Sequence, residues 1–330
     1  MGYVVVPSLM SKSPEPAIRV GTASWSEPEF VKAGWYPKGL PAGGRLAYYA
    51  QFFDYVELNS SFYAILAARM CEKWVKETPK GFLFDVKCHR LLSRHATKAD
   101  ALPADLRGEA ELTDRGNVVL TPGLQEEVAG RFLAALAPLE AAGQLGALLL
   151  QMTPGFAPRS ADLSDLAPLL RQLRGATEHP RRVVLELRHH DWLDARHRES
   201  TAAFLREEGV TLASIDGPPA DARHFTIMPA LDEITDPGLA YLRLHGRDPQ
   251  AYLTGKTVAE RFHYDYNDAE LADVTDRVRA LATGAKEVHV VFNNNSRDYA
   301  PRAAERLRQR LGQAPRRPLL PKRPTQGELL

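Results

Sequence analysis

The chain alternates between short runs rich in apolar and β-branched residues and longer segments whose apolar positions have a helical spacing. Eight runs predict strands, at residues 17–22, 55–59, 82–87, 145–151, 182–188, 210–216, 240–245 and 288–293. Seven segments predict helices, at residues 45–53, 66–78, 123–141, 162–175, 196–208, 268–283 and 300–312. Strands that are nearly all apolar and alternate with helices are typical of a parallel sheet covered by those helices.

Eight such units predict a single α/β domain, a TIM-type (β/α)8 barrel over residues 17–312. Residues 217–238 are rich in Pro and Asp and lack an amphipathic period, so we expect a loop in place of the sixth helix. A doubly wound open sheet is the alternative fold, but no glycine-rich phosphate-binding turn follows the first strand. Residues 1–16 are interpreted as an N-terminal extension, and residues 313–330, rich in Pro and Arg, as a disordered tail.

Polar residues recur on one face of these strands, because side chains two residues apart in a strand share a face. That face carries Glu57, Asn59, Asp85, Lys87, His89, Gln151, Glu186, Arg188, Ser214, Asp216, Arg243, His245 and Asn293. The alternate positions, such as Val56, Phe84 and Leu244, are apolar and are expected to pack on the helices. The polar set is therefore predicted to point into the barrel mouth, where barrel enzymes have their active sites.

Buried charges are costly unless they pair or bind a ligand, so this face is either a self-satisfied network or a ligand site. We favour a site for a small anionic, phosphate-bearing substrate in an enzyme of hydrolase or isomerase type. The candidate catalytic acid/base residues are Glu57, Glu186 and Asp216. The candidate substrate-binding residues are Lys87, Arg188, Arg243, His245, Gln151, Asn59, Asn293, Trp25 and Tyr63.

Other chemistries at the same mouth are left open. No motif predicts a cofactor, but a divalent metal is an alternative that would give a phosphoester hydrolase or a sugar isomerase. Its ligands would be Glu57, Glu186, Asp216 and His245, although the interleaved Lys and Arg side chains count against a tight metal cluster. An imine formed by Lys87 is a weaker alternative, because the neighbouring acids are expected to keep this lysine charged.

Composition narrows the choice of partners. The chain has 42 Lys and Arg against 41 Asp and Glu, a net charge of +1, so bulk basicity does not predict non-specific nucleic-acid binding. A nucleic-acid-binding or repair-type protein remains the alternative, using the mouth, the basic tail and the aromatic residues beyond the strands. No apolar stretch is long enough to span a bilayer, so no membrane partner is predicted. Cys71 and Cys88 are too few for a disulfide framework, which predicts a reduced, cytoplasmic protein.

Several motifs in a fixed order resemble the YecE-like family, the domain-of-unknown-function family 72. They are GTASW at 21–25, VELNSSFY at 56–63, ELRH at 186–189, RLHGR at 243–247 and FNN at 292–294. The resemblance runs from about residue 18 to 312 and implies a TIM-type barrel without an established reaction. In two places the chain departs from the family pattern. Thr153-Pro154 stands where members usually have two prolines, and residues 89–122 look enlarged, which we interpret as a lid or an extra rim structure.

Overall fold

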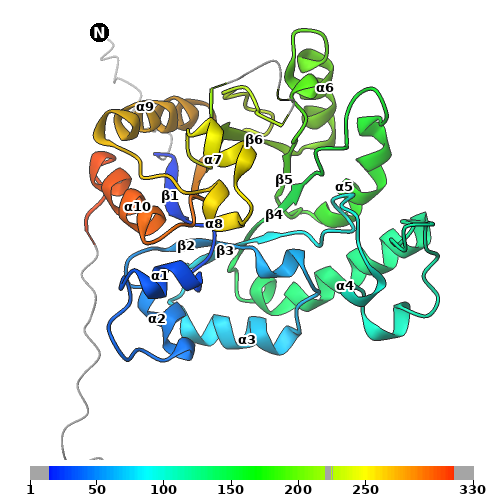
Figure 1. Cartoon of the computed structure of the whole chain (residues 1–330), viewed down its shortest axis with the longest axis horizontal. Helices are drawn as coiled ribbons and strands as arrows, with labels where there is room; N and C mark the ends of the chain where they lie inside the picture. The colour runs from blue at the N-terminus through cyan, green and yellow to red at the C-terminus, as the bar shows by residue number, and fades with distance from the viewer. Residues whose placement is uncertain (1–14, 220–223, 225, 316–330) are drawn as a thin grey trace, which may run out of the picture.

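A computed structural model describes residues 15–219, 224 and 226–315 of the chain, and its centre is a parallel sheet of eight strands (Figure 1). The strands are β1 (Ala17–Thr22), β2 (Tyr55–Leu58), β3 (Leu83–Lys87), β4 (Leu145–Gln151), β5 (Val183–Glu186), β6 (Thr211–Asp216), β7 (Ala240–Leu244) and β8 (Glu287–Phe292). Their spatial order is β1-β8-β7-β6-β5-β4-β3-β2, which places β1 beside β2 in a nearly closed barrel. The predicted TIM-type barrel is confirmed.

Helices surround this sheet and cover its outer face (Figure 1). They are α1 (Pro28–Lys32), α2 (Arg45–Tyr49), α3 (Ala68–Glu77), α4 (Pro122–Ala141), α5 (Ala167–Arg174), α6 (Arg198–Glu208), α7 (Pro249–Thr254), α8 (Val258–Arg261), α9 (Asp268–Gly284) and α10 (Tyr299–Arg310). The described residues between β6 and β7 contain no helix, as predicted for the sixth unit. The short helices α1, α7 and α8 were not predicted, because segments of four to six residues are too short to show a helical period.

The hydrophobic core lies between the outer face of the sheet and the helices. Val56, Phe84, Leu185, Leu242 and Phe292 are fully buried in it. These residues belong to the apolar strand positions that the sequence assigned to the helix-facing side. The packing therefore leaves the interior of the barrel to the alternate positions, many of which are polar.

The barrel closes between β1 and β2 through one glycine and one tyrosine. At Gly21 a Cβ atom would lie 2.3 Å from the carbonyl oxygen of Tyr55, so only glycine allows the two strands to approach this closely. The buried Tyr49 hydroxyl, from α2, accepts a hydrogen bond from the Thr22 N–H (3.0 Å) and donates one to the Tyr55 carbonyl (3.0 Å). The seam is thus bridged by a side chain that satisfies one backbone group of each strand.

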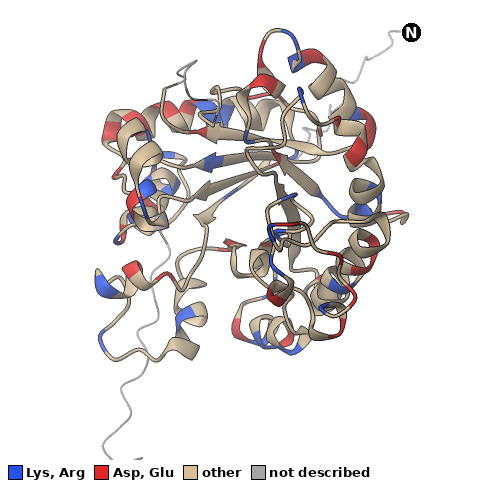
Figure 2. Ribbon diagram, turned by 45° about the vertical axis from the view of Figure 1, so that its right-hand side comes forward, with Lys and Arg blue, Asp and Glu red and all other residues tan. Residues whose placement is uncertain are grey.

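Positions of basic and acidic residues are interspersed along the outer helices (Figure 2). On α4, for example, Arg131 pairs with Glu127 and with Asp105 from a neighbouring loop. None of the helices in the described part of the chain has the length and apolar character needed to cross a membrane. Most of the predicted extension (1–16) and of the predicted tail (313–330) lies outside the described residues, so both remain predictions.

Candidate functional site

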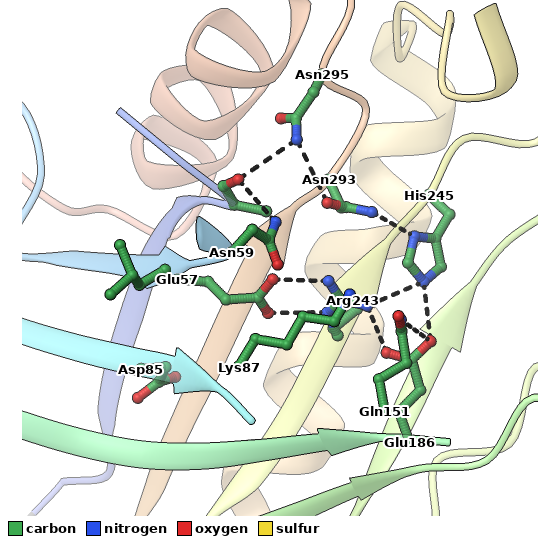
Figure 3. Close-up of polar contacts among 12 residues, drawn as sticks. Glu57, Asn59, Asp85, Lys87, Gln151, Glu186, Arg243, His245, Asn293 and Asn295 are labelled. Atoms are coloured by element: carbon green, nitrogen blue, oxygen red, sulfur yellow. Dashed lines mark hydrogen bonds and ion pairs between the residues drawn. The ribbon is translucent and has the colours of Figure 1, made fainter. Parts of the chain in front are cut away.

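Arg243 of β7 is the centre of a polar cluster inside the mouth of the barrel (Figure 3). Its side chain is 1% exposed. The guanidinium donates two parallel hydrogen bonds to the Glu57 carboxylate of β2, from Nη2 (2.7 Å) and from Nε (2.9 Å). Its Nη1 donates to Glu186 Oε2 on β5. One buried cation therefore joins two carboxylates across the barrel, and most of its donors are used within the protein.

Glu186 is held by several donors in addition to Arg243. Its Oε1 accepts from Gln151 Nε2 on β4 (2.8 Å) and from Arg188 Nη1 (3.1 Å). Burial alone would raise the pKa of Glu186, but Arg243, His245 and Arg188 together hold it well below its usual value. Glu186 is therefore ionised at neutral pH in the protein without substrate.

His245 lies between Glu186 and a group of asparagine side chains. Asn293 Nδ2 donates to His245 Nδ1 (2.9 Å), which places the proton of a neutral imidazole on Nε2, 3.5 Å from Glu186 Oε1. Burial lowers the pKa of His245 to about 4, against the raising effect of Glu186, so the ring is uncharged at pH 7. Asn295 and Asn59 both donate to the carbonyl of Ala23, and each keeps a buried side-chain oxygen without a hydrogen-bond partner.

Lys87, at the carboxyl end of β3, differs from the other cations of the cluster. Its side chain extends across the mouth beside Arg243 (Figure 3), and its Nζ makes no hydrogen bond or ion pair with any described residue. The Nζ lies 4.2 Å from the centre of the Phe62 ring. Burial and Arg243 lower the pKa of Lys87 to about 8, although Glu57 and Glu186 raise it.

A second polar layer lies deeper in the barrel, and of its members only Asp85 belonged to the polar face predicted from the sequence. The Tyr241 hydroxyl donates to Glu57 Oε2 (3.0 Å) and lies 3.2 Å from the Tyr55 hydroxyl, which donates to Asp85 (2.6 Å). Asp85 also contacts His289 Nδ1 (2.8 Å). These residues occupy the same strand face as the predicted set, two to four positions nearer the amino ends. Following the alternation one step further would have found Tyr55, Tyr241 and His289.

The prediction that Asp216 belongs to the mouth is wrong. In the register of β6 and β7, Ile215 aligns with Arg243, so Ile215 points inward and Asp216 points toward the helices. Asp216 accepts from the Tyr266 hydroxyl (2.7 Å) and pairs with Arg247 (2.5 Å) and with Arg277 of α9 (2.8 Å). It fastens the sheet to α9 and does not contact the cluster around Arg243.

The aromatic candidates separate into packing residues and one exposed ring. Trp25 is 8% exposed and packs edge-on against Trp74 of α3 and Phe84 of β3, and its contact with substrate remains a prediction. Tyr63 is 58% exposed at the rim and packs against Phe62. Phe62, which borders Lys87, was not among the predicted site residues, because a loop residue has no strand periodicity to place it.

Residues 89–122 form one wall of the mouth. His95 Nε2 lies 3.2 Å from the Gln151 carbonyl oxygen, and the His95 ring packs edge-on against Phe62 (5.0 Å). Thr153, at the altered family position, donates its N–H to the Ser93 carbonyl (3.0 Å). His89 is fully buried in this wall and makes no described contact with the cluster. A cleft of about 760 Å³ separates the wall from the loop that follows β4.

The metal alternative finds little support in this geometry. Within the described ranges, no three His, Cys, Asp or Glu side chains are arranged to hold a metal ion. The ligand set expected from the sequence is not brought together, because Asp216 lies on the far side of the sheet. Glu57 and Glu186 are both engaged by Arg243, whose positive charge opposes a second cation at the same oxygens.

Comparison with known proteins places this barrel in a family. The family model described as "Protein of unknown function DUF72" matches residues 19–328. The chain belongs to the DUF72 family. The motif resemblance is therefore confirmed. Among curated DUF72-type relatives, the UPF0759 protein YunF of Bacillus subtilis is 30% identical over 283 residues, covering 84% of this chain and 89% of YunF. The UPF0759 protein YecE of Escherichia coli is 26% identical over 206 residues, covering 62% of this chain and 61% of YecE.

Solved DUF72 structures share the architecture. A DUF72 protein from Enterococcus faecalis superposes with a TM-score of 0.73 at 25% identity, covering 93% of this chain and 99% of that one. A DUF72 protein from Thermotoga maritima gives a TM-score of 0.68 at 26% identity, covering 90% and 100% of the two chains. The family name carries no reaction, so function has to be argued from the site.

Proposed function

We propose that this protein is an enzyme that binds a small phosphate-bearing substrate at the mouth of its barrel. Lys87 and Arg188 bind the anion in this proposal, and Glu186 exchanges protons with the substrate. The observation that carries it is the Lys87 ammonium group, which has no hydrogen-bond or ion-pair partner among the described residues. Burying a cation without a partner is costly, and an anionic ligand would offset that cost.

The charge balance of the cluster supports an anion. Three cations (Lys87, Arg188 and Arg243) face two carboxylates (Glu57 and Glu186), which leaves one surplus positive charge while His245 is neutral. Arg243 already satisfies both carboxylates, so the surplus lies with Lys87 and Arg188. Arg243 itself is best assigned to positioning the two carboxylates, since a side chain 1% exposed and engaged with both of them cannot reach a substrate.

Unused hydrogen-bonding groups around the cluster suit the same kind of ligand. Arg188 directs Nη1 to Glu186 and Nη2 to Tyr252, and its buried Nε has no hydrogen-bond partner within the described ranges. The free oxygens of Asn59 and Asn295 could accept hydrogen bonds from hydroxyl groups. A phosphate-bearing polyol has both an anion for Arg188 and Lys87 and hydroxyls for the asparagines. Polar groups left without partners in a buried site are expected to be satisfied by a ligand.

Of the proposed carboxylates, Glu186 is the better candidate for proton transfer. Glu57 is bound through both oxygens by Arg243 and by the Tyr241 hydroxyl, so it is assigned to holding the site together. Glu186 touches His245 and Arg188 at its Oε1. An anion arriving at Arg188 would raise the pKa of Glu186 by like-charge repulsion and make it a stronger base when substrate is bound.

Phosphate binding tests this proposal. Inorganic phosphate and pyrophosphate would be titrated calorimetrically into the wild type, Lys87→Met and Arg188→Met. Each variant should weaken binding about tenfold or more, which corresponds to the loss of a charge-assisted hydrogen bond. Lys73→Met is the matched control, because Lys73 is 60% exposed on α3 and should not affect affinity. Unchanged affinity in a folded Lys87→Met protein would reject the assignment.

The nucleic-acid alternative has weaker support. Base stacking needs exposed rings, and of the rim aromatics Trp25, Phe62 and Trp192 are each at most 8% exposed, whereas Tyr63 is exposed. Titration of short DNA and RNA oligonucleotides at low salt, with wild type and Tyr63→Ala, would test it. Binding that falls steeply with salt and is weakened by Tyr63→Ala would favour this alternative.

A further inference from the structure

We propose that Lys87 is a nucleophile that forms an imine with the carbonyl group of an anionic aldehyde, ketone or 2-oxo acid bound in the mouth. This inference rests on the proposed anion site and adds a carbonyl group to the chemistry of its substrate. Lys87 can take this covalent role because the other charged side chains of the cluster pair with one another.

The position of the Lys87 nitrogen suits such a role. It lies at the carboxyl end of β3, in the mouth, with the face of the Phe62 ring 4.2 Å away. Other lysines are engaged by the protein: Lys32 pairs with Glu29 (2.7 Å), and Lys98 donates to the Arg115 carbonyl (2.5 Å). A carbonyl carbon can therefore approach the Lys87 nitrogen without first breaking a hydrogen bond or ion pair.

The sequence suggested that surrounding acids would keep Lys87 charged, and the structure shows why they do so only weakly. Glu57 and Glu186 face Lys87, but both are neutralised by Arg243. The remaining charged or titratable groups around it are Arg188, His95 and, across the Phe62 ring, Arg90. Of the neighbouring cations, Arg243 and Arg188 add to the effect of burial, and the resulting pKa of about 8 leaves about one tenth of Lys87 as the free amine at pH 7. Desolvated lysines of this kind are the ones that form imines in enzymes.

The step balances without an added oxidant or reductant. The Lys87 ammonium releases one proton to a base in the mouth, for which Glu186 is the candidate. The nitrogen lone pair forms a bond to the carbonyl carbon, and a proton moves from nitrogen to oxygen to give a carbinolamine. The first proton then returns to the hydroxyl, the carbon–oxygen bond breaks, and water leaves. The product is an iminium ion with the same charge as the original ammonium.

Conservation of charge links this step to the anion site. The surplus positive charge of the cluster is present before and after the reaction, so an anion held by Arg188 is balanced throughout. The iminium also withdraws electrons from the adjacent carbon and makes its protons acidic. Glu186, which accepts a hydrogen bond from Arg188, could then act as the base for that carbon.

Reductive trapping tests the inference. The full-length protein would be incubated with glyoxylate, an anionic aldehyde, or with glycolaldehyde, a neutral one, in the presence of cyanoborohydride, and the adducts mapped by peptide mass spectrometry. We expect trapping at Lys87 to exceed trapping at the exposed residues Lys32 and Lys73 by about tenfold or more at pH 7, because a desolvated amine is the better nucleophile. The rate at Lys87 should rise with pH to a midpoint near 8. Lys87→Arg keeps the charge and should remove the adduct from a folded protein.

The two aldehydes separate this inference from the proposed function. If glyoxylate is preferred over glycolaldehyde at Lys87, and phosphate or Arg188→Met abolishes the preference, both the nucleophile and the anion site are supported. If both aldehydes label Lys87 equally and phosphate does not compete, the nucleophile stands and the anion site fails. If phosphate binds but Lys87 is trapped no faster than Lys32 and Lys73, the imine is rejected and the anion site stands.

Discussion

Removing the charge of Arg243 should destabilise the protein more than any other single change in the cluster. In Arg243→Met, Glu57 keeps only the Tyr241 hydroxyl as a donor, whereas Glu186 keeps Gln151 and Arg188. Breaking a buried ion pair in this way costs about 3–5 kcal/mol, because a carboxylate remains buried without its counter-charge. That is a large part of the total stability of a typical domain.

Urea unfolding followed by circular dichroism would measure this loss. Arg206→Met is the matched control, since Arg206 is 43% exposed and its pairing should contribute at most about 1 kcal/mol. Adding Glu57→Gln to Arg243→Met removes the unpaired charge, so the double variant should lose less free energy of unfolding than the two single losses add up to. The coupling should be about 1–3 kcal/mol.

The pH dependence of the Arg243→Met defect follows from Glu186. In the wild type, Arg243 holds the pKa of Glu186 below its unfolded value, so the contribution of Glu186 to stability is present at pH 7 and is lost only in acid. Without Arg243, which is the first of the groups that lower this pKa, we expect burial to bring it above the unfolded value. The variant then recovers stability as the pH falls, so its deficit should be smaller at pH 5 than at pH 7. A loss under about 1 kcal/mol at pH 7, or a deficit independent of pH, would refute the reasoning.

Three further predictions concern the seam, the histidine and the misplaced acid. Tyr49→Phe removes the hydroxyl that bridges Thr22 and Tyr55, which should lower the free energy of unfolding by about 1–3 kcal/mol in urea titrations; an unchanged midpoint would contradict the bridge. Between pH 7 and pH 5 the wild type should lose about 2 kcal/mol through His245, because unfolded imidazole binds a proton that the buried ring, with a pKa of about 4, does not. His245→Gln should lack that part of the slope, and equal slopes would count against it. Asp216→Asn should lower the melting temperature without weakening phosphate binding. A roughly tenfold loss of phosphate affinity would contradict the placement of Asp216 outside the mouth.

The arrangement of the site could be predicted strand by strand, but only where the inward face was assigned correctly. Glu57, Lys87, Glu186 and Arg243 were recognised because polar and apolar residues alternate around them. In β6 the same alternation gave a wrong prediction. Asp216 is polar but faces α9, where two arginines pair with its carboxylate and a tyrosine donates a hydrogen bond to it. Alternation along a strand predicts which residues share a face, but it does not show which of the two faces points into the barrel.

The sequence by itself determined the number and order of the strands, the barrel, the missing sixth helix and the concentration of polar residues at the strand ends. These features follow from local spacing, which is a property of neighbouring residues. Only the tertiary structure decided that Arg243 is enclosed by Glu57 and Glu186 and that Lys87 finds no partner in the part of the chain that the structure describes. Glu57 and Arg243 are 186 positions apart, and their pairing depends on the register and curvature of the whole barrel. Charge pairing across a barrel is set by distance in space, which local spacing does not encode.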